Sequence, residues 1–245
     1  MQVDATCVQL RPRPMFEAAD LGVRLVQVSA RSLLRTALPV YAVCAALCWS
    51  LLPLAPWAPS LALWLAKPWL DRTLLFVLSR SLFGQPTTAA DLWGAARSVW
   101  WQGLLASLST RRLSPWRAFT QPARQLEGLK GTALRKRVAQ LKRGHQGAAL
   151  GATYGFWHLE SALALGLPAL ALWLVPGGLS LAPLQWLSGD ANLTGTVIFT
   201  LAYTVAVGVV EPFYVGAGFA MYINRRVELE AWDVEQALRH AFGTR

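Results

Sequence analysis

Long apolar stretches alternate along the chain with polar segments that are rich in arginine and lysine. Three stretches contain no charged residue: 36–66 (31 residues), 161–189 (29 residues) and 191–210 (20 residues). About 20 apolar residues are enough for a helix to cross the hydrocarbon core of a bilayer. The pattern therefore predicts an all-α, polytopic membrane protein and excludes a soluble enzyme domain.

Proline, glycine and tryptophan turns divide the apolar stretches into four transmembrane helices. We expect these spans at about 36–52, 58–82, 148–174 and 193–223, with the last one interrupted at Glu211-Pro212. Polar residues recur every three or four positions between residues 17 and 35, which is typical of an amphipathic helix lying in the headgroup plane. A second interfacial helix is expected at 89–108, although the pattern leaves open whether it crosses. Shorter helices are expected at 134–141 and from 224 to about 242.

The distribution of positive charge predicts the topology. Residues 111–143 contain ten Lys/Arg and one acid, so this segment supplies +9 of the net charge of +10. Basic loops stay on the cytoplasmic side of a membrane, whereas 53–60 and 176–192 contain no Lys or Arg. Both termini should therefore be cytoplasmic. Without a nucleic-acid reader motif, we assign the basic residues to the lipid bilayer and its anionic headgroups. The candidate headgroup contacts are Arg111, Arg112, Arg135, Lys136 and Arg137.

Comparison of the chain with itself predicts an internal repeat. A shift of 144 residues places Lys67-Pro68-Trp69 on Glu211-Pro212-Phe213, and shifts of 129 and 142 align the flanking segments in the same order. Because each unit holds an even number of spans, the two copies should be parallel repeats. The predicted organisation is a first repeat at 1–110, a basic cytoplasmic loop at 111–145 and a second repeat at 146–245.

Two segments resemble a known family. Residues 211–235 read EPFYVGAGFAMYINRRVELEAWDVE, and residues 67–84 read KPWLDRTLLFVLSRSLFG. Both are similar to an uncharacterised bacterial integral-membrane family that resembles the membrane domain of glycerophosphodiester phosphodiesterases and is distantly related to Yip-type membrane proteins. The resemblance implies a multi-helix fold in the bacterial inner (cytoplasmic) membrane. It also implies other membrane proteins as partners, including a MoxR-type AAA+ ATPase system. The phosphodiesterase activity does not carry over, because the chain has no room for the catalytic domain.

The chain contains no nucleophile, metal or phosphate-loop motif, so we expect no enzyme activity, no metal and no cofactor. His158 and Glu160 are the nearest approach to a catalytic pair, but residues two apart point to different faces of a helix. We interpret this histidine as a headgroup-level residue.

Four charged residues inside the predicted spans are the candidate site: Lys67, Asp71, Arg72 and Glu211. An unpaired charge at the centre of a membrane helix costs about 2.5–3.5 kcal/mol, so such residues pair or line a polar path. One arrangement pairs Lys67 with Asp71 along one helix and leaves Arg72 for Glu211. The other pairs Lys67 with Glu211 between the repeats.

The sequence favours a non-enzymatic scaffold or subunit of a membrane assembly, in which the charges form structural ion pairs. The alternative is a small-solute or lipid transporter or channel that uses them as its binding site.

Overall fold

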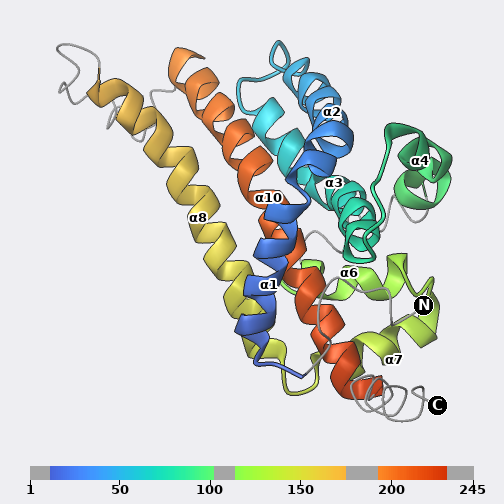
Figure 1. Ribbon diagram of the computed structural model, residues 1–245. Coiled ribbons are helices and arrows are strands. Elements are labelled where there is room, and N and C mark those ends of the chain that lie inside the picture. Colours follow the sequence, from blue (N-terminus) through green and yellow to red (C-terminus); the bar gives the residue numbers. More distant parts are fainter. Residues whose placement is uncertain (1–11, 102–113, 175–192, 231–245) are drawn as a thin grey trace, which may run out of the picture.

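The structure is a computed structural model that describes residues 12–101, 114–174 and 193–230 (Figure 1). Every regular element in these ranges is helical, which confirms the all-α prediction. The elements are α1 (Met15–Val28), α2 (Ala30–Trp49), α3 (Ala58–Leu82), α4 (Ala89–Gly94), a short π-helix η2 (Arg97–Trp101), α6 (Arg117–Gln125), α7 (Gly131–Lys142), α8 (Gln146–Trp173) and α10 (Leu193–Glu230). Arg111, Arg112, the loop 176–192 and the helix predicted beyond 230 lie outside the described residues.

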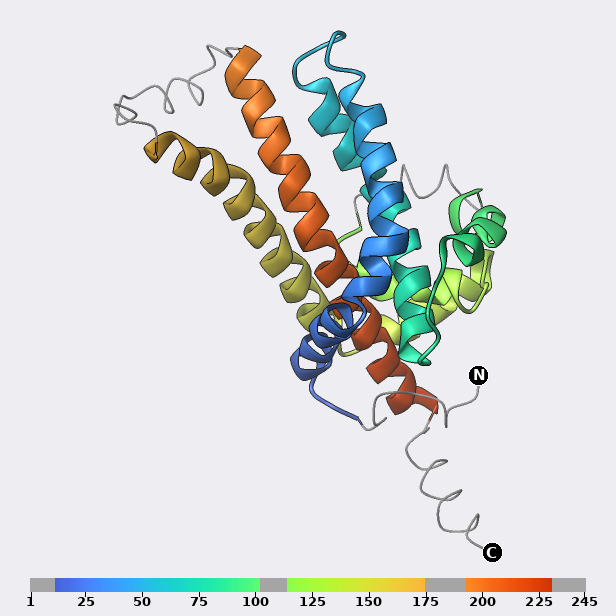
Figure 2. The ribbon, with the colours of Figure 1, turned by 45° about the horizontal axis from the view of Figure 1, so that its top comes forward.

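Helix α10 is the centre of the structure. It packs against α8 on one side and against α3 on the other, while α1 and α6 pack across its C-terminal half. Figures 1 and 2 both show α8 and α10 diverging towards the C-terminal end of α8, so the two helices meet mainly along the N-terminal half of α8 and the C-terminal half of α10. A cavity lies between α8 and the helices α3 and α10.

Two predicted boundaries are wrong. The amphipathic helix ends at Val28, and α2 begins at Ala30 rather than at 36. Arginine has a high helix propensity, so Arg31 and Arg35 form the first turns of α2 instead of ending the preceding helix. Likewise α10 continues unbroken through Glu211-Pro212. Proline removes a single backbone donor, and neighbouring groups can satisfy the carbonyl that it leaves.

The long helices are apolar outside and charged inside. Their exposed large side chains include Leu47 on α2, Leu61 on α3, Leu165 on α8 and Val205 on α10, whereas Lys67, Asp71, Glu160 and Glu211 are buried. Among the described residues, α2 and α10 are long and apolar enough to cross a membrane.

Small residues let α1 and α6 approach α10 closely. A Cβ atom added to Gly22 would lie 2.2 Å from the carbonyl oxygen of Gly216, and one added to Gly218 would lie 2.4 Å from the Cβ of Ala118. Glycines along a membrane helix can serve internal packing or a partner surface. At Gly216 and Gly218 they serve internal packing.

Candidate functional site

Five buried charged side chains from four helices meet in the interior, and we call them the charge cluster. They are Lys67 and Asp71 of α3, Arg117 of α6, Glu160 of α8 and Glu211 of α10, all between 0% and 7% exposed. Lys67 Nζ lies 2.6 Å from Glu211 Oε2 and also pairs with Glu160. Arg117 Nη2 lies 2.6 Å from Glu211 Oε1, and its Nε lies 2.7 Å from Asp71 Oδ2. Glu211 therefore joins the two cations.

Helix geometry places these groups together. Lys67 and Asp71 are four residues apart, so they lie on one face of α3. Arg117 is the first residue of α6, and the ring of Tyr214 supports its guanidinium, with 5.2 Å between Cζ and the ring centroid. The hydroxyl of the same tyrosine accepts a 3.4 Å hydrogen bond from the backbone N–H of Ala118. These contacts hold the start of α6 against α10.

The cluster is close to electrically balanced. Its three carboxylates face two cations, and Arg72 adds a third positive charge next to Asp71 along α3. The guanidinium of Arg72 donates hydrogen bonds to the backbone carbonyls of Val99 at 3.2 Å and Trp100 at 3.5 Å. Burying a charge is costly unless it is paired, and each charge of the cluster lies in an ion pair with an opposite charge.

The structure distinguishes the two pairings that the sequence left open. Lys67 of α3 pairs with Glu211 of α10. The arginine that pairs with Glu211 is Arg117 and not Arg72. Asp71 pairs with Arg117 rather than with Lys67. The prediction that Lys67 pairs with Asp71 and Arg72 with Glu211 is therefore wrong. The long side chain of Lys67 instead contacts carboxylates on two other helices, those of Glu160 and Glu211.

Sequence reasoning missed two members of the cluster. Glu160 is the single charged residue between positions 148 and 174, but from the sequence we considered it only as a possible catalytic partner of His158. A lone carboxylate in an apolar span needs a partner, so this signal was available. Arg117 gave no such signal, since it is one of ten basic residues in its segment. His158 itself is exposed, and its Nδ1 lies 2.8 Å from the carbonyl oxygen of Tyr154 on the same helix.

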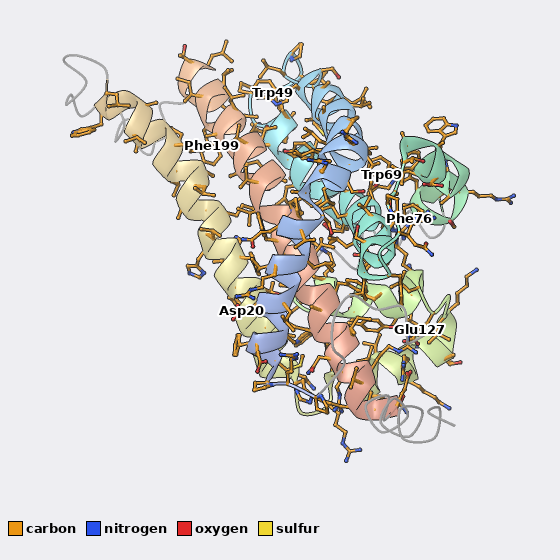
Figure 3. The ribbon with its side chains drawn as sticks, in the orientation of Figure 1. Asp20, Trp49, Trp69, Phe76, Glu127 and Phe199 are labelled. Atoms are coloured by element: carbon orange, nitrogen blue, oxygen red, sulfur yellow. The ribbon has the colours of Figure 1, made fainter. Side chains whose placement is uncertain are left out.

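The candidate headgroup residues of α7 divide into two groups. Arg135 and Lys136 are exposed. Arg137 instead donates to Glu127, with Nε 3.0 Å from Oε2, and to Glu230 at the end of α10. Burial raises the pKa of Glu230, but hydrogen bonds from Arg226 and Arg137 outweigh this effect and lower its pKa overall. Figure 3 shows Glu127 between α7 and the end of α10, so Arg137 fastens these helices together.

A cavity of about 630 Å³ leads to the charge cluster from the space between α8 and the helices α3 and α10. Lys67, Glu160 and Glu211 lie in its wall, together with aromatic side chains that include Trp64, Trp157 and Phe199. Figure 3 shows Phe199 on the side of α10 that faces α8. The cavity thus has apolar walls and a charged inner end.

Among the described residues, no group of three or more His, Cys, Asp or Glu side chains is placed to hold a metal ion.

No protein-family model matches this chain, and no curated protein or solved structure is similar to it. The family resemblance of residues 67–84 and 211–235 therefore stays a prediction.

Proposed function

We propose that the protein is a non-enzymatic integral membrane protein that acts as a scaffold or subunit of a membrane assembly. The observation that carries this proposal is the polarity of the bundle. Apolar side chains cover the outside of α2, α3, α8 and α10, and a paired charge cluster lies inside. This polarity suits a lipid environment, where charged residues face the interior of a bundle.

In this proposal α2, α3, α8 and α10 are the four spans in the bacterial inner membrane, with both termini in the cytoplasm. Helices α1, α6 and α7 lie at the cytoplasmic end, where Arg135 and Lys136 contact anionic headgroups. The contact between Lys67 and Glu211 supports the two parallel repeats, because the two residues are equivalent under the shift of 144 residues.

The completeness of the ion pairing supports a structural role for the charge cluster. Lys67 and Arg117 each contact two carboxylates. A group that binds a transported solute must be able to exchange its partner, whereas these cations are held from both sides. We therefore interpret the cluster as the element that fastens α3, α6, α8 and α10 together.

The second candidate function is a carrier or channel for a small solute or a lipid. The observation that favours it is the cavity of about 630 Å³ between α8 and the bundle, which ends at Lys67, Glu160 and Glu211. Apolar walls with a few polar groups are typical of ligand sites. In this function α8 would move against α10, since the two helices diverge at their outer ends.

Copurification and transport assays separate the two functions. The scaffold proposal predicts that the tagged protein, extracted in mild detergent, recovers the same membrane partners in fixed stoichiometry. The family resemblance predicts that an AAA+ ATPase of the MoxR type is among these partners. An unrelated tagged four-span protein serves as the control. The purified chain in liposomes should show no solute or lipid flux above that of empty liposomes. Recovery of the chain alone, together with flux that Glu160→Gln abolishes, would overturn the scaffold proposal in favour of the carrier.

A further inference from the structure

A second cavity, of about 340 Å³, lies between α3, η2, α6 and α7, and we call it the α3–α6–α7 pocket. Four cationic residues contribute to its wall, namely Arg72, Arg117, Arg124 and Lys130. The remaining lining residues of the pocket, including Thr120 and Gln121, are neutral, and no carboxylate is among them. Arg72 and Arg117 belong to the charge balance of the neighbouring cluster, so Arg124 and Lys130 give the pocket its excess of positive charge.

The positive charges of this pocket are only partly compensated. Arg117 is neutralised by Asp71 and Glu211 of the charge cluster, and Arg72 donates to backbone carbonyls of η2. Arg124 differs, because its Nη1 is buried and has no hydrogen-bond partner. Its guanidinium also lies close enough to that of Arg72 for the two positive charges to repel each other. A buried charged donor without an acceptor is costly, and an anion in the pocket would remove that cost.

The chemistry of the wall defines the class of anion. Arginine presents a planar fork of N–H donors that matches the oxygen atoms of phosphate. Arg72 and Arg124 come from two helices, and Lys130 stands immediately before α7, so they can approach one group from different sides. Because Arg72 counts toward the balance of the charge cluster, Arg124 and Lys130 supply the excess positive charge. Two such charges suit a phosphate better than a carboxylate, since phosphate carries more charge and more acceptor oxygens.

We propose that the α3–α6–α7 pocket binds a phosphate group, supplied either by a phospholipid headgroup or by free phosphate. Both sources offer the same acceptor oxygens to Arg124. The two differ in whether acyl chains are needed for binding. The lipid source rests on the membrane placement proposed above, whereas binding of free phosphate does not, so the two proposals can fail separately.

Ligand-dependent thermal unfolding of the full chain in a nonionic detergent tests this site. The probes are inorganic phosphate, dioctanoyl phosphatidic acid and dioctanoylglycerol, which lacks the phosphate, all at constant ionic strength. A saturable rise in Tm with inorganic phosphate identifies a free phosphate site. A rise with phosphatidic acid alone identifies a lipid headgroup site. No rise with either phosphate-bearing probe, or an equal rise with dioctanoylglycerol, would overturn the proposal.

Two substitutions in the pocket and one outside it make the test specific. Arg124→Gln removes a charged hydrogen-bonding group and should weaken binding about tenfold or more. Lys130→Gln changes an exposed residue at the pocket rim and should weaken binding about threefold or more, which keeps the test open if the first variant fails to fold. Arg135→Gln removes an exposed arginine of α7 outside the pocket and should change binding less than twofold. Equal weakening by Arg135→Gln and Arg124→Gln would show non-specific attraction and contradict the site.

Stability without ligand provides an independent readout. Because Arg124 Nη1 has no hydrogen-bond partner, Arg124→Gln should leave the Tm of the ligand-free protein unchanged or raise it. A purely structural arginine would instead lose stability on substitution. A lower Tm of the ligand-free variant, with phosphate binding intact, would overturn the assignment of Arg124 to the ligand.

Discussion

Lys67→Met should lower the free energy of unfolding by about 3–5 kcal/mol, the usual cost of breaking a buried ion pair by removing one partner. Lys67 is the cation shared by Glu160 and Glu211. After the substitution Glu211 keeps Arg117, but Glu160 loses its partner in the cluster. Most of the loss should therefore come from Glu160, and thermal unfolding in detergent measures it. Lys136→Met, which changes an exposed lysine, is the matched control and should have little effect.

The double variant Lys67→Met/Glu160→Gln should recover a large part of that loss, because neither member of the pair then remains charged. Glu211→Gln alone should cost less than Lys67→Met, since Lys67 keeps Glu160 and Arg117 keeps Asp71. A double-mutant cycle measures the coupling between Lys67 and Glu160. Strictly additive losses would mean that the two residues do not interact.

Gly22→Ala should destabilise the protein by about 2–3 kcal/mol, the upper part of the range for overpacking an interior. The added Cβ would lie 2.2 Å from Gly216 O and 2.7 Å from Ala217 Cα. Both are backbone atoms, so relief requires α1 to move away from α10. Thermal unfolding in detergent again measures the effect.

Gly155→Ala on α8 is the matched control, because nothing lies within 4 Å of a Cβ added there. Alanine has a higher helix propensity than glycine, so this variant should be neutral or more stable by up to about 1 kcal/mol. Similar Tm values for the Gly22 and Gly155 variants would show that α1 does not pack closely on α10.

Apolar length and turn residues were enough to predict the long helices. The helix bounds predicted at 58–82 and 148–174 match those of α3 and α8 closely. The predicted short helix at 134–141 lies within α7, which begins three residues earlier. Boundaries placed on charge were wrong, as at residue 36, because charged residues can continue a helix.

The site was harder to predict than the helices. Its position within the spans was visible from Lys67, Asp71 and Glu211, because charges in apolar stretches are rare. Their partners depended on how the helices pack, and the spacing of residues along the chain does not show that packing. Helix α6 shows the difficulty most clearly. It lies in the basic segment and has few apolar residues, yet its first residue, Arg117, is buried in the interior.

Cysteine labelling in intact cells tests the four-span arrangement most directly. Cys7, Cys44 and Cys48 are first replaced by serine or alanine, and single cysteines are then placed at Pro56, Leu184, Gln125 and Lys136. An impermeant thiol reagent should label cysteines at Pro56 and Leu184, and it should label those at Gln125 and Lys136 only after the cells are permeabilised. Pro56 precedes α3 and Gln125 ends α6, and in the four-span arrangement α3 is the one crossing between them, so labelling of both from outside would contradict the account.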